Sequence, residues 1–91
     1  MRRVLVVDDS ETLLKVATAL LEEAGWNVEC ARDAETGAAM AFAAHPDAVV
    51  SDLWMPGLNG LMLCRLLHED ASTAGLPVVL LSASADRRSR F

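Results

Sequence analysis

Three aspartates and one serine could do chemistry in this chain, because they stand at the ends of predicted strands. Asp8 and Asp9 follow the first predicted strand, Asp52 the third and Ser82 the fourth. Ligands of open parallel sheets bind at the carboxyl ends of the strands, where these side chains would meet. Neighbouring carboxylates repel one another unless a cation binds between them, and oxygen ligands suit a hard ion. The sequence therefore predicts a Mg²⁺ site.

Asp52 is the candidate nucleophile of this predicted site. It stands alone at its strand end, opposite the acidic pair, and the Pro56-Gly57 turn that follows would hold it at the mouth of the pocket. A carboxylate beside Mg²⁺ can attack phosphorus, because the metal offsets charge on the transferring group. Ser82 could donate a hydrogen bond to a phosphoryl oxygen. The backbone carbonyl of Trp54 is within plausible reach of the metal.

The elements that must position these groups alternate between strand and helix. Short apolar runs predict strands at residues 4–7, 26–31, 48–51 and 78–81. Amphipathic spacing, with Ser10 and Asp33 as N-caps, predicts helices that span residues 10–24, 33–44 and 60–70. The residues after Ser84 resemble the first turn of a fourth helix. This order predicts a doubly wound α/β fold with a parallel sheet and helices on both faces.

Several other side chains are expected to have structural roles only. The third predicted helix should bury its apolar face, which consists of Met62, Leu63, Leu66 and Leu67. Cys30 and Cys64 lie in apolar runs without metal-ligand spacing, which predicts buried, reduced thiols. His45 and His68 lie at predicted helix ends and are expected to be solvated.

Length and charge narrow the classes of protein further. The 91 residues fit one small domain, and 8 Lys+Arg against 13 Asp+Glu give a net charge of −5. An acidic domain lacks the basic footprint of a nucleic-acid binder, so no direct nucleic-acid contact is expected. The longest apolar stretch, residues 38–44, is far shorter than the roughly 20 residues that span a bilayer. We therefore expect a cytoplasmic protein without a membrane segment.

Three stretches of the sequence resemble the receiver domain of two-component response regulators. They are residues 4–10, 51–60 and 77–83, and together they extend the resemblance over the whole chain. The resemblance implies a flavodoxin-like fold with strand order 2-1-3-4-5. It also implies that a sensor histidine kinase or phosphotransfer protein phosphorylates Asp52.

The same resemblance assigns roles to the other candidate residues. Asp8 and Asp9 would hold Mg²⁺, and Asp52 and the Trp54 carbonyl would complete the protein ligands. Ser82 would be the switch hydroxyl that moves toward the aspartyl phosphate. The chain is expected to be a phosphoacceptor with at most weak autophosphatase activity, and not a turnover enzyme.

The sequence also departs from the family pattern. Receivers carry a phosphate-pairing lysine at the end of a fifth strand, and no lysine follows Ser82 before the chain ends at Phe91. We therefore expect a single receiver domain over residues 1–91, incomplete at its C-terminus, with strand order 2-1-3-4 and without the fifth strand and last helix. Asn59 stands where the family commonly has an acidic residue. An exposed fourth strand predicts self-association.

Three other interpretations stay open at this point. Asp8 and Asp9 could simply complement the start of a helix. Without the lysine, the chain could be a receiver-like interaction module that is not regulated by phosphorylation. The third interpretation is an aspartate-nucleophile phosphohydrolase, but such enzymes have a second aspartate two residues after the nucleophile, where this chain has Trp54.

Overall fold

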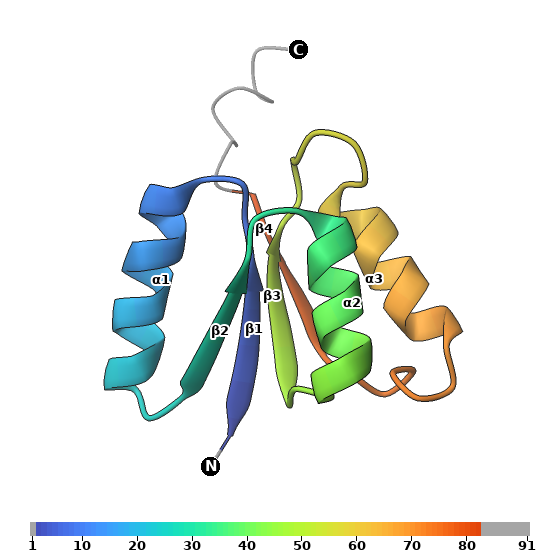
Figure 1. The fold of residues 1–91 in the computed structure, drawn as a ribbon, viewed down its shortest axis with the longest axis horizontal. Helices are drawn as coiled ribbons and strands as arrows, with labels where there is room; N and C mark the ends of the chain where they lie inside the picture. Colours follow the sequence, from blue (N-terminus) through green and yellow to red (C-terminus); the bar gives the residue numbers. More distant parts are fainter. Residues whose placement is uncertain (1, 83–91) are drawn as a thin grey trace.

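The computed structural model describes residues 2–82. It consists of a parallel four-stranded sheet with helices on both sides (Figure 1). The strands are β1 (Arg3–Val7), β2 (Asn27–Ala31), β3 (Ala48–Asp52) and β4 (Val78–Leu81). The helices are α1 (Glu11–Glu23), α2 (Ala34–Ala44) and α3 (Gly60–Glu69). The order β2-β1-β3-β4 confirms the predicted fold and strand order. The helical turn expected after Ser84 lies outside the described residues.

β1 lies inside the sheet and is covered on both faces. Its residues from Val4 to Val7 are all at most 4% exposed, which explains why the strand shows no alternation of polar and apolar residues. Successive side chains point to opposite faces. Leu5 and Val7 therefore join the core under α2 and α3, while Val6 faces α1.

Each helix begins at a residue whose side chain accepts a hydrogen bond from the first turn. Ser10 accepts from the Leu13 amide of α1 at 3.2 Å, and Asp33 from the Thr36 amide of α2 at 2.6 Å. Asn59 does the same for α3, accepting from the Met62 amide at 2.9 Å. The amide side chain that departs from the family pattern is thus the N-cap of α3.

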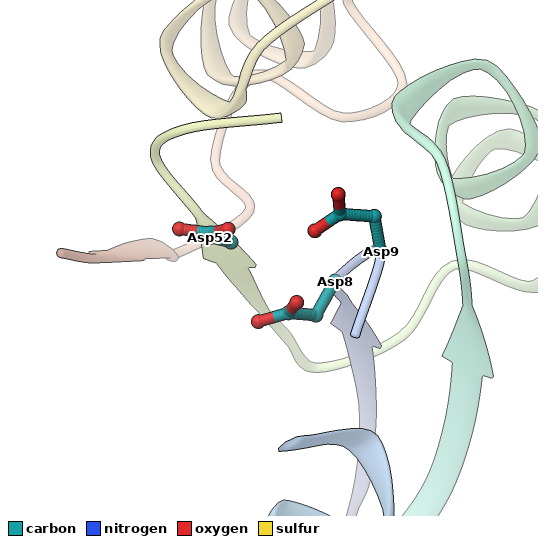
Figure 2. A group of neighbouring side chains, drawn as sticks. All are labelled: Asp8, Asp9 and Asp52. Carbon is teal, nitrogen blue, oxygen red and sulfur yellow. The ribbon is translucent and has the colours of Figure 1, made fainter. Parts of the chain in front are cut away.

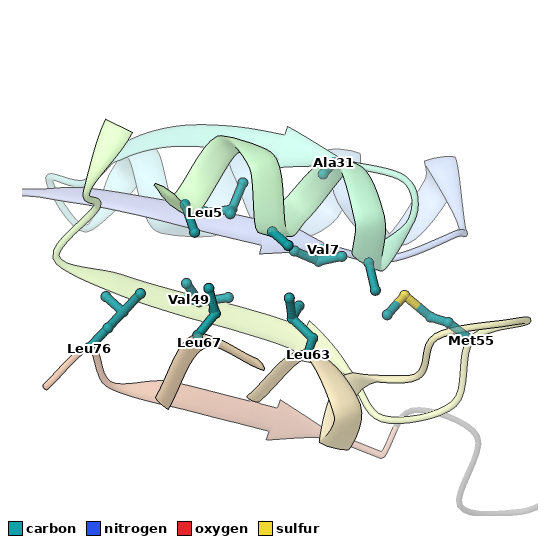
Figure 3. Packing of buried hydrophobic residues seen from close by; sticks show 11 residues of the cluster. Leu5, Val7, Ala31, Val49, Met55, Leu63, Leu67 and Leu76 are labelled. Carbon is teal, nitrogen blue, oxygen red and sulfur yellow. The ribbon is translucent and has the colours of Figure 1, made fainter. Parts of the chain in front are cut away.

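The main hydrophobic core lies between the sheet and the pair α2 and α3 (Figure 3). Its largest fully buried side chains are those of Leu5, Val7, Val49, Leu63 and Leu67. α1 covers only the β1 and β2 part of the opposite face. The rest of that face, over β3 and β4, is open in residues 2–82.

This open area forms an apolar groove between α1 and β4. It is lined mainly by Leu13, Val16 and Leu20 of α1, together with Val50 and Leu81 of the sheet. The three α1 side chains are 41%, 51% and 64% exposed. We call this set of five residues the α1 groove.

The prediction of a fully buried apolar face on α3 was half wrong. Leu63 and Leu67 are completely buried, but Met62 and Leu66 are 48% and 40% exposed. α3 packs against α2 and β4, and only a narrow stripe of residues four positions apart faces them. The side chains next to that stripe have no covering element among the described residues.

The prediction of buried thiols was also wrong. Cys30 is exposed and Cys64 is half-buried, although both are free thiols as expected. Cys30 lies on β2, an edge strand with a neighbour on one side only.

Among residues 2–82, no helix is both long enough and apolar enough to cross a membrane.

Candidate functional site

Three carboxylates meet at the carboxyl ends of the two inner strands (Figure 2). Asp8 and Asp9 follow β1, and Asp52 is the last residue of β3. Val7 and Ser51 are partners across these adjacent parallel strands, so the next residue of each strand falls at the same height. One carboxylate oxygen from each aspartate lies within 4.8 Å of the others. The strand-end positions in the sequence therefore do converge.

The Asp8 carboxyl is buried and lies near two other negative charges. The Asp8 side chain is 7% exposed. Burial raises the pKa of this carboxyl, and the negative charges of Asp52 and Asp9 raise it further. A hydrogen bond from the Ser10 amide to Asp8 Oδ1, at 2.8 Å, opposes the rise. The N-cap of α1 is Ser10, so capping does not account for Asp8.

Asp52 is held by the loop that follows it. Its side chain is 5% exposed, and Oδ1 accepts a hydrogen bond from the Trp54 amide at 3.1 Å. The Leu53 amide donates to the Leu81 carbonyl at 2.8 Å, and the Gly60 amide donates to the Leu53 carbonyl at 3.2 Å. These hydrogen bonds connect the end of β3, the loop that follows it and the start of α3, and so fix the position of the Asp52 carboxylate.

Ser82 lies at the same edge of the sheet. It directly follows Leu81, which is the strand partner of Asp52. Lys15, the only lysine of the sequence, lies in α1, where its ammonium group is 3.9 Å from the Glu11 carboxylate. Within the described part of the chain, Lys15 forms no ion pair with Asp52.

Two groups beside the cluster were missed in the sequence. The guanidinium of Arg32, just past β2, donates to the backbone carbonyl of Asp9 at 3.3 Å. The Ser10 amide, described above, supports Asp8. A contact to a backbone atom leaves no pattern in the residue types, so only the position of Arg32 at a strand end could have drawn attention to it.

The donor set fits Mg²⁺. All three side chains supply carboxylate oxygens, and Asp8 and Asp52 are nearly buried. Among residues 2–82, no lysine or arginine forms an ion pair with any of the three carboxylates. Hard divalent ions take such ligands and leave positions for phosphate oxygens. The arrangement is suited to binding a cation and a phosphoryl group together.

Comparison with known proteins identifies the family. The sequence-family model of the response regulator receiver domain matches residues 4–90 of this chain. The chain belongs to this family. It is therefore a module of two-component signalling. Receiver domains are generally non-enzymatic signalling domains.

Individual relatives agree with this assignment. The chain is 43% identical over 82 residues to protein PilH of Pseudomonas aeruginosa. These 82 residues are 90% of this chain and 68% of PilH. It is 40% identical over 89 residues to the response regulator PleD of Caulobacter vibrioides, but these span only 20% of PleD. The chemotaxis response regulator CheY4 of Vibrio cholerae matches with a TM-score of 0.85 at 28% identity, over 98% of this chain and 76% of that one.

The raised pKa of Asp8 predicts how the stability of this receiver domain depends on pH. The folded state holds the Asp8 proton more tightly than the unfolded state, so this group favours folding below the ordinary aspartate pKa of about 3.9. Its contribution is lost as the pH rises through the higher folded-state value. We expect Asp8→Asn to raise the free energy of unfolding at neutral pH without Mg²⁺, by about 1 kcal/mol.

Thermal unfolding of both proteins, with and without Mg²⁺, checks this prediction. Mg²⁺ at ten times its dissociation constant should stabilise the native protein by about 1.4 kcal/mol, and Asp8→Asn much less. Asparagine keeps an acceptor oxygen for the Ser10 amide, so the variant isolates the charge. A lower melting temperature for metal-free Asp8→Asn than for the native protein would contradict the prediction.

Proposed function

We propose that this receiver domain accepts a phosphoryl group on Asp52 from a sensor histidine kinase or phosphotransfer protein, with Mg²⁺ as cofactor. The convergence of Asp8, Asp9 and Asp52 within 4.8 Å is the observation that carries the proposal. Membership of the receiver family supports it. The predictions of a cytoplasmic location and of no direct nucleic-acid contact belong to the same proposal.

The residues of the chain would divide the work as follows. Asp8, Asp9, Asp52 and the Trp54 carbonyl would hold the metal, which when bound offsets negative charge on the carboxylates and on the transferring phosphoryl group. The Trp54 amide orients Asp52 through Oδ1. We assign the attack on phosphorus to Asp52 Oδ2: an O–P bond forms, the P–N bond to the donor imidazole breaks, and the donor nitrogen takes up a proton.

Ser82 would respond to the phosphorylated state. Ser82 follows Leu81, the strand partner of Asp52, and this position at the carboxyl end of β4 supports the proposal. A hydroxyl can donate to a phosphoryl oxygen, and movement of Ser82 toward Asp52 would displace the end of β4. In this proposal, hydrolysis of the aspartyl phosphate is slow and the domain does not turn over substrate.

Intact mass measured after incubation with acetyl phosphate tests the proposal. We expect a gain of one phosphoryl group in the presence of Mg²⁺ and none when the metal is chelated. Circular dichroism of the same sample establishes that the protein is folded. A folded sample that gains no phosphoryl group with Mg²⁺ would reject phosphorylation of this chain.

That negative result would favour the second candidate, a receiver-like module that binds partners without phosphorylation. The position of Lys15, paired with Glu11 on α1, is the observation in its favour, because receivers use a lysine to pair with the phosphate. The phosphohydrolase interpretation has less support, since residue 54 is a tryptophan whose side chain is 40% exposed and not a second carboxylate.

We further propose that the chain associates with a second copy through β4. β4 is the edge of the sheet in residues 2–82, and its outward-facing Val79 and Leu81 are 50% and 47% exposed. An unpaired edge strand offers free amide and carbonyl groups to another strand. Antiparallel pairing of two β4 strands about a two-fold axis would also bring the two α1 grooves next to each other and cover apolar surface.

Sedimentation of the native chain and two variants checks this association. We expect a dimer for the native chain and a monomer for Val79→Lys, because a lysine on an edge strand opposes strand pairing. Leu61→Lys is the matched control, since Leu61 is 44% exposed but belongs to α3 and not to β4, and this variant should stay dimeric. A monomeric native chain at high concentration would refute the proposal.

A further inference from the structure

Cys64 and His68 form a hydrogen-bonded pair on α3, outside the acidic cluster. They are four residues apart, and Cys64 Sγ lies 3.6 Å from His68 Nδ1. The other ring nitrogen, Nε2, lies 2.8 Å from the backbone carbonyl of Leu76. His68 is exposed, as expected for a solvated side chain, but its ring also bridges a thiol on α3 and the segment that leads into β4.

The Leu76 carbonyl decides which nitrogen of His68 carries the proton. A carbonyl oxygen only accepts hydrogen bonds, so Nε2 must donate. In the neutral imidazole the remaining nitrogen, Nδ1, is then an acceptor. The thiol of Cys64 is consequently the donor in its contact with Nδ1. The thiol proton already points at a base, and the Leu76 carbonyl would stabilise the imidazolium formed by accepting it.

The second cysteine, Cys30, has no such base in contact with it among residues 2–82. Cys30 Sγ lies 3.2 Å from the hydroxyl of Thr18, which does not take up a proton near neutral pH. Cys30 is exposed, whereas Cys64 is half-buried. The more accessible thiol, Cys30, thus has no base beside it among residues 2–82, while the less accessible thiol, Cys64, does. Comparing their reaction rates distinguishes the effect of exposure from the effect of the base.

We propose that Cys64 is a site of thiol modification, with His68 as the base that takes the thiol proton. A nucleophile within reach of a base that is itself oriented by a third group is the arrangement that activates thiols generally. The reagents it suits are peroxides and soft carbon electrophiles. The reaction requires no part of the acidic cluster.

With hydrogen peroxide the step balances as follows. The thiol proton moves to His68 Nδ1, and Cys64 Sγ attacks one peroxide oxygen while the O–O bond breaks. The departing hydroxide takes the proton from Nδ1 and leaves as water. The sulfur is oxidised to a sulfenic acid and the peroxide is reduced.

A competition between the two cysteines tests the proposal on the native chain. Brief exposure of the folded protein to limiting iodoacetamide, followed by digestion and mass spectrometry, gives the alkylation rate at each site. We expect Cys64 to react about tenfold faster than Cys30 despite its lower exposure. The two rates should converge in denaturant. If Cys30 reacts as fast as Cys64 in the folded protein, exposure governs reactivity and the proposal fails.

His68→Gln separates the base from the hydrogen bond. Glutamine has an amide that can donate to the Leu76 carbonyl, but it cannot take up the thiol proton. We expect the Cys64 rate to fall at least to that of Cys30, while Cys30 serves as an internal control. Dimedone should trap a peroxide-induced sulfenic acid at Cys64 in the native chain and not in this variant. An unchanged Cys64 rate in folded His68→Gln would overturn the proposal.

Discussion

Asp52→Asn is expected to abolish the Mg²⁺-dependent gain of a phosphoryl group without unfolding the protein. An asparagine side chain has no carboxylate to attack phosphorus, but its oxygen can still accept the hydrogen bond from the Trp54 amide. The substitution also removes one negative charge from a cluster in which Asp52 is 5% exposed. Metal-free Asp52→Asn should therefore melt at the same temperature as the native protein or higher.

Asp33→Asn is the matched control for this experiment. Asp33 is the N-cap of α2, and asparagine caps helices about as well as aspartate. The control makes the same chemical change outside the cluster and should be phosphorylated like the native protein. A mass gain that persists in Asp52→Asn would assign the phosphoryl group to another residue and refute the role proposed for Asp52.

Gly60→Ala is expected to have the largest effect on stability. A Cβ atom on Gly60 would collide with the Asp52 carbonyl oxygen, and it would lie 3.1 Å from both the Asp52 carbonyl carbon and Leu53 Cα. All of these are backbone atoms, which cannot rotate away as a flexible side chain would. We expect a loss of about 3 kcal/mol, roughly 15 °C in melting temperature, together with weaker Mg²⁺ binding.

Gly75→Ala is the control for adding a methyl group to a glycine. A Cβ atom on Gly75 meets no atom within 4 Å, so the change in stability should stay within about 0.5 kcal/mol. Urea unfolding of the two variants and the native chain measures the difference. If Gly60→Ala were as stable as Gly75→Ala, the close approach of α3 to the Asp52 carbonyl would not be required for the fold.

The sequence predicted the elements that local patterns determine. The apolar run before Asp8 predicts β1, and Ser10 and Asp33 predict the starts of α1 and α2, because a capping side chain acts on amides within its own first turn. The convergence of the aspartates was predictable for a related reason. Parallel strands carry their terminal residues to one edge, so a position at a strand end is also a position in space.

Other features depend on which element lies opposite, and local patterns do not contain that information. The spacing of Met62 and Leu66 predicts an apolar side of α3, but not which part of it α2 and β4 cover. The contact between His68 and the Leu76 carbonyl joins residues eight positions apart through a turn, and it involves a backbone atom. Residue types alone do not reveal such a partner.

The strand order implies that the two parts of the proposed site, the three carboxylates and Ser82, differ in how easily their strands unfold locally. The carboxylates come from the ends of β1 and β3, and each of these strands has a neighbour on both sides. Ser82 follows β4, which lies at the edge in residues 2–82. Inner strands exchange their amide hydrogens only through near-global unfolding, whereas edge strands fray locally at a low free-energy cost. The groups that would hold the metal and the phosphate thus belong to the slowest-exchanging part of the sheet, and the hydroxyl that would respond to phosphorylation belongs to a part that can move while the rest stays folded.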